Sequence, residues 1–380
     1  MPLPLAKDAQ IEEAIALIAE AKRPYIYIGG GAAGLGMGKE VLALADKIDA
    51  YVGCSFMGLS AIPEVGGRFL GMQGMHGHYA SSMAQKDADL IIGVGVRFSD
   101  RATGNVKKYA TGAKIIQLDP DFAEINKNVR VNLGIVGDVR DAFARIAAGV
   151  AEKKNPAWNE IVSGYKADEA RFEAEAEALA GDRLTPKKIF DIINAKKKPA
   201  TVIATDVGQH QMWAAQYATY DRPRRFVSSG GLGTMGFGLG AAMGAQVATN
   251  DPVVLITGDG SFGMNLNELA TAVTYNIPVV IVLLNNGVLG MVRQWQTLFF
   301  GGRYSNTVLE RKTDFVKLAE AFGAQAYRAT DAEQFTAAFE AAVSANAPVV
   351  IDTLIDKDEF VLPMLPPGGS IDDIITKVQK

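Results

Sequence analysis

The residues best suited to chemistry lie in two short strings, GDGS at 258–261 and NN at 285–286. Each string follows an apolar run, 252–257 and 279–284, that we predict to be a strand. Open α/β folds bind ligands at the carboxyl edge of their strands, so Asp259 and the asparagines should meet there. One carboxylate and one amide oxygen, completed by phosphate oxygens, commonly hold Mg²⁺. The pattern therefore predicts a magnesium-diphosphate site.

The small residues of GDGS fit the same interpretation. Glycine lets a backbone approach a diphosphate closely, and a helix that begins at Ser261 would direct its first amides at phosphate oxygens. A GDG triplet alone also occurs in ordinary turns, which is the alternative interpretation. The paired asparagines, placed after one helix and one apolar strand, favour the ligand site.

The elements that must position these residues predict an α/β fold with two doubly wound parallel-sheet domains. In the first half, the expected strands 25–28, 90–94, 114–118 and 135–136 each run into Gly or Asp. In the second half, the expected strands are 200–205, 252–257, 279–284 and 348–354. Helical patterns separate them, for example at 11–22 and 39–47. Such alternation implies parallel sheets covered by helices on both faces.

Composition suggests where the domains end. Residues 1–150 form the first expected domain, and the Glu-, Ala- and Lys-rich segment 151–184 reads as a connecting helix or linker. Thr185-Pro186 is typical of a helix start, with Thr185 as N-cap, and opens a second domain over 185–355. The proline-rich stretch within 356–380 predicts an irregular C-terminal arm.

The totals exclude several classes of function. A net charge of −4 without basic clusters argues against nucleic acid, and no apolar run is long enough for a membrane span. Three histidines and one cysteine make a zinc site or a disulfide framework improbable. Because the start carries no signal-peptide pattern, we expect a cytoplasmic protein.

Longer strings point to a family. They are TDVGQHQMWAAQ (205–216), SGGLGTMGFGLGAA (229–242), GDGSFGMNLNEL (258–269), LNNGVLGMVRQWQ (284–296), GMHG (74–77), RFSDR (97–101) and VLPMLPPGG (361–369). With these strings, the chain resembles the large catalytic subunits of the acetolactate synthase family of thiamine-diphosphate enzymes. The resemblance covers essentially the whole chain.

The resemblance implies roles in the second domain. The magnesium ligands would be Asp259, Asn286 and the carbonyl of Val288. The thiamine diphosphate would be surrounded by Gly208, Gln209, His210, Gly233, Gly260, Ser261 and Gly290. Met235 would lie under the thiazolium ring, and Met291 and Trp295 would line the substrate pocket. From spacing alone, core filling by the methionines, packing by the indole and helix capping by His210 remain alternatives.

The resemblance also implies that the first domain binds flavin adenine dinucleotide. The matched positions are Gly29, Gly31, Met75, His76, Gly95, Arg97, Arg101, Asp119 and Asp138. Arginines suit a pyrophosphate, and a carboxylate at a strand end suits a ribose hydroxyl. Plain surface charges are the alternative for the arginines. The family usually has two aspartates in the RFSDR string, whereas this chain has Ser99 before Asp100, which predicts weaker flavin binding.

The implied activity is decarboxylation of pyruvate and condensation with a second 2-oxo acid, pyruvate or 2-oxobutyrate, in branched-chain amino-acid synthesis. Full-length members begin with a pyrimidine-binding domain whose glutamate activates the cofactor. We find no counterpart to it and expect weak or no activity from this chain alone. Expected partners are further copies of the chain, a chain supplying that domain and a small regulatory subunit. Two alternatives are a catalytically silent cofactor-binding or assembly module and a sister enzyme such as glyoxylate carboligase.

Overall fold

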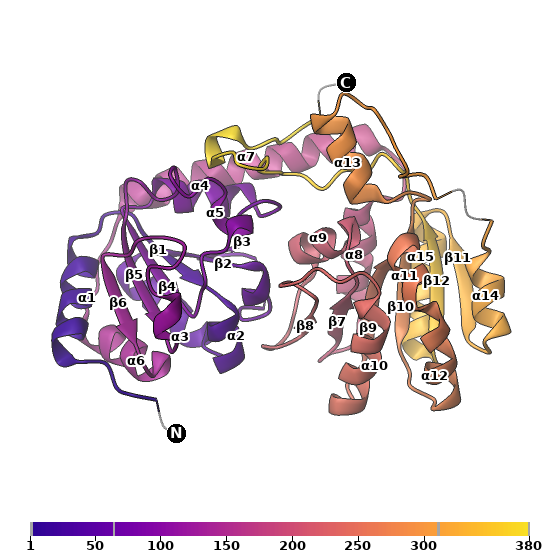
Figure 1. Ribbon diagram of the computed structural model, residues 1–380, viewed down its shortest axis with the longest axis horizontal. Helices are drawn as coiled ribbons and strands as arrows, with labels where there is room; N and C mark the ends of the chain where they lie inside the picture. The colour runs from indigo at the N-terminus through magenta and orange to yellow at the C-terminus, as the bar shows by residue number, and fades with distance from the viewer. Residues whose placement is uncertain (1–2, 64, 310–311, 379–380) are drawn as a thin grey trace. The chain divides into compact units, whose positions relative to one another are not determined.

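The computed structural model describes residues 3–63, 65–309 and 312–378. Its contacts group the chain into two compact units. Unit 1 consists of Met1–Ala176, Arg222–Arg224 and Leu362–Lys380, and unit 2 of Glu177–Asp221 and Arg225–Val361. Each unit is a parallel sheet flanked by helices (Figure 1). The α/β fold class expected from the sequence is confirmed, and the domain limits drawn from composition stay a prediction.

Unit 1 has six parallel strands in the order β3-β2-β1-β4-β5-β6. Their bounds are β1 (Pro24–Ile28), β2 (Tyr51–Cys54), β3 (Phe69–Met72), β4 (Leu90–Val94), β5 (Lys114–Asp119) and β6 (Leu133–Val136). The chain moves outward from β1 to β3, then returns to β4 on the other side of β1. This reversal places the topological switch point, where doubly wound sheets bind ligands, between β1 and β4.

The helices of unit 1 cover both faces of this sheet, so every residue of β1 and β4 is buried. They are α1 (Asp8–Glu20), α2 (Gly30–Leu35), α3 (Gly38–Ile48), α4 (Tyr79–Asp87), α5 (Asp100–Thr103), α6 (Val139–Gly149) and α7 (Pro156–Ala180), with 3₁₀ turns η1 (Phe56–Gly58), η2 (Phe122–Glu124) and η4 (Ile371–Asp373). Tyr25 and Tyr27 of β1 share one core cluster with Trp158 of α7. The indole nitrogen of Trp158 also donates to the Pro24 carbonyl at 3.2 Å. Helix α7 thus occupies most of the segment for which the sequence allowed a helix or a linker.

Unit 2 has a second parallel sheet, in the order β11-β12-β10-β9-β7-β8. Its strands are β7 (Val202–Thr205), β8 (Phe226–Val227), β9 (Val253–Gly258), β10 (Val280–Asn285), β11 (Gln325–Ala329) and β12 (Val349–Leu354). The chain goes from β7 to β8 on one side and then to β9 on the other. The switch point of this sheet therefore lies between β7 and β9.

Alternate residues of β10 enter two different cores. Val280, Val282 and Leu284 belong to one cluster, and Ile281 and Leu283 belong to the other. Because side chains of a strand alternate between the faces of a sheet, these clusters are the two buried faces. The helices and 3₁₀ turn of unit 2 are α8 (Pro186–Lys196), α9 (Gln209–Tyr217), α10 (Phe237–Thr249), α11 (Asp259–Asn265), η3 (Leu266–Glu268), α12 (Leu269–Thr274), α13 (Gly290–Phe299), α14 (Phe315–Ala321) and α15 (Ala332–Ser344).

Local signals in the sequence explain where some of these helices begin. The predicted start at Thr185 is confirmed, because its hydroxyl accepts from the Lys188 amide at 3.2 Å and Pro186 is the first helical residue. The expected helix start at Ser261 is wrong by two residues. Strand β9 continues to Gly258, and α11 begins at Asp259, whose carboxylate in the first turn is favourable for the helix dipole.

The C-terminal strap, defined here as residues 362–378, packs within unit 1. The Leu365 amide donates to the Met75 carbonyl at 2.7 Å, and the Asn105 amide donates to the Gly369 carbonyl at 2.9 Å. Apart from η4 it is irregular, as the prolines of this region predict. These bonds place the strap beside the loop that carries Met75.

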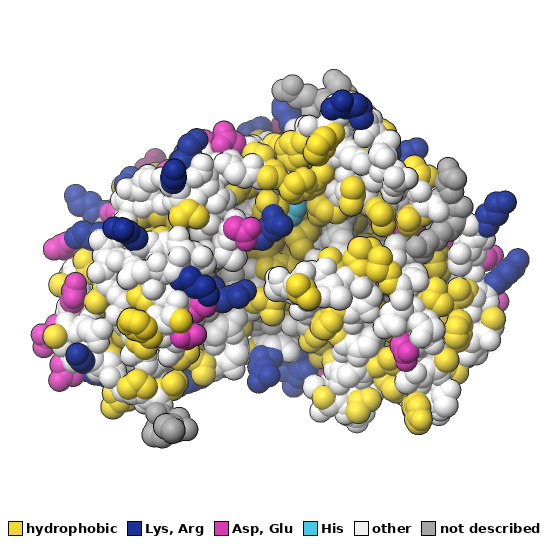
Figure 2. Space-filling view, in the orientation of Figure 1, with side chains coloured by type: hydrophobic (Ala, Val, Ile, Leu, Met, Phe, Trp, Pro, Cys, Tyr) yellow, Lys and Arg dark blue, Asp and Glu magenta, His cyan; other side chains and the backbone are white. Residues whose placement is uncertain are grey.

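Three further properties concern hydropathy, surface charge and the cysteine. None of the helices in the described part of the chain combines the length and apolar character needed to cross a bilayer. On the face drawn in Figure 2, Lys and Arg side chains are interspersed with Asp, Glu and apolar side chains, rather than gathered in one basic surface. The single cysteine, Cys54, is buried, and burial raises the pKa of its thiol, so it behaves as a small core residue.

Candidate active site

The carboxyl ends of β7, β9 and β10 bring the main candidate residues together in unit 2. In the parallel register, Thr205 of β7 pairs with Ile256, and Gly258 of β9 pairs with Leu284 of β10. The residues that follow these positions therefore emerge at one edge, beside the switch point (Figure 1). They include all the predicted diphosphate and magnesium positions of 206–210, 258–261 and 286–290.

Asp259 and Asn286 offer the oxygen ligands expected for Mg²⁺. Asp259 is only 3% exposed and opens α11 directly after β9. The Asn286 side-chain oxygen accepts from the Val288 amide at 3.1 Å, and its nitrogen lies 3.4 Å from Gln209 Oε1. No group of three His, Cys, Asp or Glu side chains suited to a metal occurs among the described residues. A cation at this edge would therefore need amide and carbonyl oxygens beside the carboxylate, which suits Mg²⁺.

The neighbouring asparagine has a different role. Asn285 Nδ2 donates to Asp352 Oδ1 at 2.8 Å, and the other carboxylate oxygen of Asp352 accepts from Arg328 at 3.1 and 3.2 Å. Asp352 is 1% exposed, so these bonds satisfy a buried charge between β10, β11 and β12. Of the two asparagines, Asn286 contacts the candidate site, and Asn285 links β10 to β12 through Asp352.

Loop 286–290 is held in place from two sides. The Leu289 amide donates to the Thr307 carbonyl at 2.8 Å, and the Leu309 amide donates to the Gly287 carbonyl at 3.0 Å. Between these bonds, Val288 forms a bridge with Val308. This pairing fixes the backbone at Val288, whose carbonyl is the third predicted magnesium ligand.

Gln209 connects the first turn of α9 to α13. Its side-chain nitrogen donates to Gln294 Oε1 at 2.9 Å and to the Glu359 carbonyl at 2.8 Å. Gln294 in turn exchanges hydrogen bonds with the backbone of Val361 at 2.9 and 3.0 Å. Gly290 lies beside this network, and a Cβ there would overlap Gln209 Oε1 unless that side chain moved. The sequence identified Gln209 and Gly290 but not Gln294.

His210 is a buried, neutral histidine at the same edge. Burial lowers the pKa of its imidazole from 6.5 to about 3, and a hydrogen bond to the Asp206 backbone opposes that shift. The ring packs against two glycines, since a Cβ at Gly258 would lie 2.9 Å from Nδ1 and one at Gly208 would lie 2.8 Å from Cε1. Its Nε2 is buried without a partner among the described residues. An unpaired imidazole nitrogen at a helix start beside glycines marks a buried polar position that a ligand would complete.

Asp206, which the sequence analysis did not identify, organises the turn around Met235. Its Oδ1 accepts from the Gly236 amide at 2.8 Å and from the Val207 amide at 2.9 Å. Burial raises the pKa of this carboxyl, although these hydrogen bonds oppose the shift. Gly236 has φ +90°, which favours glycine, so the turn beside Met235 is fixed. The signal for Asp206 was its position directly after a predicted strand, as for Asp259.

The remaining predicted residues of unit 2 differ in burial and in their contacts. Ser261 Oγ donates to the Val207 carbonyl at 2.6 Å and joins α11 to the loop after β7. Met235 is half-buried, and its methyl carbon lies 3.7 Å from where a Cβ at Gly260 would be. The loop position Gly233 is exposed, at φ +71°. Ser261, Met235 and Gly260 therefore lie around one edge of the sheet.

Met291 and Trp295 lie on α13 and are both half-buried. Met291 packs against the core that includes Val282, so core filling accounts for part of its position. Trp295 meets Phe299 edge-on at 5.6 Å between ring centroids, within the same helix. Their predicted contact with substrate stays a prediction.

In unit 1, three predicted glycines pack backbone against backbone at the switch point. The Gly29 amide donates to the Val94 carbonyl at 3.0 Å, and the Gly31 amide donates to the Gly95 carbonyl at 3.1 Å. A Cβ at Gly29 would overlap the Gly95 carbonyl oxygen, and one at Gly31 would lie 2.9 Å from Gly95 Cα. Gly95 itself has φ +56°. Only glycine fits these positions, and the turn that results is of the kind that approaches a dinucleotide.

The other predicted flavin positions differ in their exposure and in whether their polar atoms already have hydrogen-bond partners. The Met75 amide donates to the Arg101 carbonyl at 2.8 Å, which joins the GMHG and RFSDR strings. Arg97 and Arg101 are exposed, whereas His76 is buried. Asp119 ends β5, and burial raises the pKa of its carboxyl. Asp138 caps α6, accepting from the Arg140 and Asp141 amides at 3.0 and 3.1 Å.

Comparison with protein families matches both units. Residues 206–353 match the C-terminal TPP binding domain of thiamine pyrophosphate enzymes, and residues 11–146 match the central domain of the same enzymes. This chain belongs to the thiamine pyrophosphate enzyme family. The first match contains every candidate residue of unit 2, and the second contains every candidate residue of unit 1.

Relatives of this thiamine pyrophosphate enzyme align along nearly all of its length. It is 42% identical over 98% of its length to the acetolactate synthase large subunit of Corynebacterium glutamicum. It is 41% identical over 100% to the probable acetolactate synthase large subunit of Methanocaldococcus jannaschii, and 41% identical over 97% to the isozyme 2 large subunit of Escherichia coli. The chain spans 61%, 65% and 66% of these curated relatives, respectively.

Proposed function

We propose that this chain contributes the thiamine diphosphate and Mg²⁺ site of an acetolactate synthase. The proposed reaction is decarboxylation of pyruvate and condensation with a second 2-oxo acid, giving 2-acetolactate or 2-aceto-2-hydroxybutyrate. The observation that carries the proposal is the edge between β7 and β9, where Asp259, Asn286 and His210 come together with glycine backbone. Relatives that align with nearly the whole chain are named acetolactate synthase large subunits.

Different residues would contact the metal, the diphosphate, the cofactor ring and the substrate. Asp259, Asn286 and the Val288 carbonyl would hold Mg²⁺ against the diphosphate, and Gly208, His210 and the first turn of α11 would contact its oxygens. Thiamine diphosphate, when bound, supplies the carbanion-stabilising chemistry that the protein lacks. Met235, held by the turn that Asp206 fixes, would support the ring of the cofactor. Met291 and Trp295 would select the acceptor acid by their size.

For unit 1 we propose a flavin adenine dinucleotide site at the switch point between β1 and β4. The tight glycine turn formed by Gly29, Gly31 and Gly95 supports it, because doubly wound sheets bind dinucleotides at a glycine-rich turn at their switch point. The buried carboxyl of Asp119, at the end of β5, suits a ribose hydroxyl. Asp138 contributes less, since its carboxylate already caps α6.

The relatives' names also guide the proposed partners. Those relatives are named large subunits, and for this chain we propose self-association and a smaller regulatory partner. A reducing, cytoplasmic location is compatible with its one buried cysteine.

The direct test is an assay for acetolactate with pyruvate, thiamine diphosphate, Mg²⁺ and flavin. It is run with the chain alone and after addition of the pyrimidine-binding domain of an acetolactate synthase. We expect cofactor binding in both samples and acetolactate in the second. Thiamine diphosphate binding that is independent of Mg²⁺, or a different product from pyruvate, would refute the proposal.

A further inference from the structure

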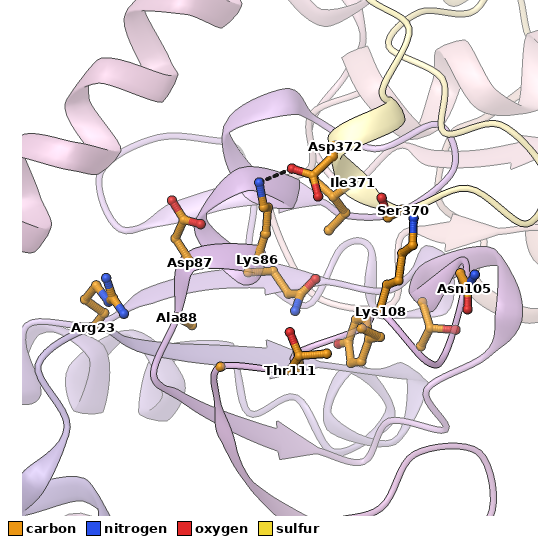
Figure 3. A pocket seen from close by; sticks show the side chains of 15 residues that line it. Arg23, Lys86, Asp87, Ala88, Asn105, Lys108, Thr111, Ser370, Ile371 and Asp372 are labelled. Carbon is orange, nitrogen blue, oxygen red and sulfur yellow. Dashed lines mark hydrogen bonds and ion pairs between the residues drawn. The ribbon is translucent and has the colours of Figure 1, made fainter.

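A cavity of unit 1 lies at the opposite edge of its sheet from the glycine turn. Its volume is about 280 Å³. Its lining includes Arg23, Ala88 and Gly112, which lie one or two residues before the starts of β1, β4 and β5, respectively. These are the amino ends of the strands, whereas Gly29 and Gly95 follow the carboxyl ends. The cavity, whose lining side chains are drawn in Figure 3, is therefore separate from the proposed flavin site.

Gln85, on α4, is the unusual residue of this cavity. Its side chain is fully buried, and neither its nitrogen nor its oxygen has a hydrogen-bond partner among the described residues. Buried carboxamides are normally paired, because an unpaired donor or acceptor away from water is unfavourable. A ligand that completes Gln85 must offer one acceptor for Nε2 and one donor for Oε1.

The charges around the cavity favour an anion. Lys86 is already paired with Asp372 of the strap, and Asp87 accepts from the Tyr165 hydroxyl. Arg23 and Lys108 line the cavity and form no ion pair with any described residue. In Figure 3 Arg23 lies at one end of the group of lining side chains, and Lys108 lies well away from it, beyond Lys86. Two separated cations suit a molecule with an anionic group at each end.

We propose that this cavity binds a small hydroxydicarboxylate. Its two carboxylates would lie toward Arg23 and Lys108, and its hydroxyl would donate to Gln85 Oε1 while a carboxylate oxygen accepts from Nε2. A cavity of 280 Å³ has room for a four-carbon hydroxydiacid. Ser370 and Asp372 form part of the wall, so the ligand joins α4 to the C-terminal strap. The inference rests on unit 1 alone and is independent of thiamine diphosphate chemistry.

The test is calorimetric titration of the whole chain with L-malate, with succinate and with inorganic phosphate. Succinate has both carboxylates of malate but lacks the hydroxyl, so it isolates the contribution of Gln85. We expect malate to saturate one site and to bind at least about tenfold more tightly than succinate, because a site built around a hydroxyl rejects its analogue. Equal affinity for malate and succinate, or no saturation by any of the three anions, would overturn the proposal.

Variants locate the site. Lys108→Met should weaken malate binding about tenfold, which is typical of losing one charge-assisted hydrogen bond. Lys107→Met is the matched control, since Lys107 is equally exposed but does not line the cavity. Gln85→Met should remove the preference for malate over succinate. Because Lys108 is exposed, its variant should fold and still tests the site if Gln85→Met does not fold. Identical effects of the two lysine variants would contradict the site, and phosphate binding as tight as malate would contradict the ligand class.

Discussion

The two units use the same topology to prepare two different kinds of ligand edge. In unit 2 the switch point gathers buried polar side chains, among them Asp206, His210 and Asp259. In unit 1 the switch point is formed by glycine backbone, and Arg97 and Arg101 remain exposed. A sheet edge can therefore be specialised through side chains that converge or through side chains that are absent.

The difference has a physical consequence for substitutions. At the unit 2 edge, a substitution removes a hydrogen bond or a charge and leaves most of the backbone in place. At the unit 1 edge, any added atom meets backbone, as at Gly29 against the Gly95 carbonyl. We therefore expect unit 2 variants to lose ligand binding first and unit 1 variants to lose stability first.

The largest expected effect is on cofactor affinity. Asp259→Asn should weaken Mg²⁺-dependent thiamine diphosphate binding at least about 100-fold, because even partners outside the coordination shell contribute 10–100-fold. Asp119→Asn, the strand-end counterpart in unit 1, should weaken flavin binding no more than about tenfold, since an amide still accepts a hydroxyl hydrogen bond. Fluorescence titration measures both affinities. Glu333→Gln, an exposed charge change on α15, is the control, and similar losses for both aspartates would erase the contrast between the units.

The next effect is on stability. Gly29→Ala should lower the free energy of unfolding by about 1–3 kcal/mol, the usual range for overpacking, because its Cβ has no space between backbone atoms. Gly34→Ala is the matched control in α2: nothing lies within 4 Å of its Cβ, so the variant should be neutral or stabilised by up to about 1 kcal/mol.

Gly290→Ala is the unit 2 counterpart, and there the obstacle is the end of a flexible side chain, Gln209. It should reduce thiamine diphosphate affinity more than stability. Urea unfolding and cofactor titration separate the two effects. If Gly290→Ala destabilises the fold as much as Gly29→Ala, flexible and rigid neighbours do not differ as we argue.

A third effect depends on pH and comes from His210. Burial holds its pKa near 3 in the folded chain, against 6.5 for the ordinary side chain. Below pH 6.5 the unfolded chain therefore binds a proton that the folded chain does not, so stability falls as pH drops toward 3. The slope is at most about 1.4 kcal/mol per pH unit. Urea unfolding at pH 7.0 and 5.5 should show a fall of about 1 kcal/mol that His210→Asn removes. An unchanged fall in that variant would assign the pH dependence to other groups.

The smallest effect concerns substrate choice. Trp295→Phe should shift the ratio of 2-oxobutyrate to pyruvate used as acceptor by roughly tenfold or less, as expected for a modest change in pocket volume. Arg97→Ala in unit 1 should weaken flavin binding and leave that ratio unchanged. Competition between 2-oxobutyrate and pyruvate in one assay measures this acceptor ratio. A shift caused by Arg97→Ala would mean that unit 1 also selects the acceptor.

Much of this contrast was predictable from local sequence. Apolar runs bounded by glycine or aspartate located the central strands, and residues just beyond them located Asp259 and Gly29. Four strands were missed. β2 and β3 have four residues each with a glycine inside, β8 has two residues, and β11 has only its last residue buried and lacks an apolar run.

The supporting residues of the site were missed for another reason. Gln294 meets Gln209 from 85 positions away, and Asp206 meets Gly236 from 30 positions away. Spacing along the chain carries no signal for such pairs, because tertiary folding alone brings them together. The unpaired carboxamide of Gln85 was equally invisible, since its environment comes from three separate segments.

The alternation along β10 also constrains insertions and deletions. Even-numbered residues of this strand face the core that contains Phe190 of α8, and odd-numbered residues face the opposite core. The same count delivers Asn285 to Asp352 and Asn286 to Gln209. Removing a single residue from β10 would put Asn286 in the place of Asn285 and Gly287 in the place of Asn286, and it would move the strand residues that follow the deletion to the opposite face of the sheet. The site therefore depends on the register of this strand as much as on the identity of any one residue in it.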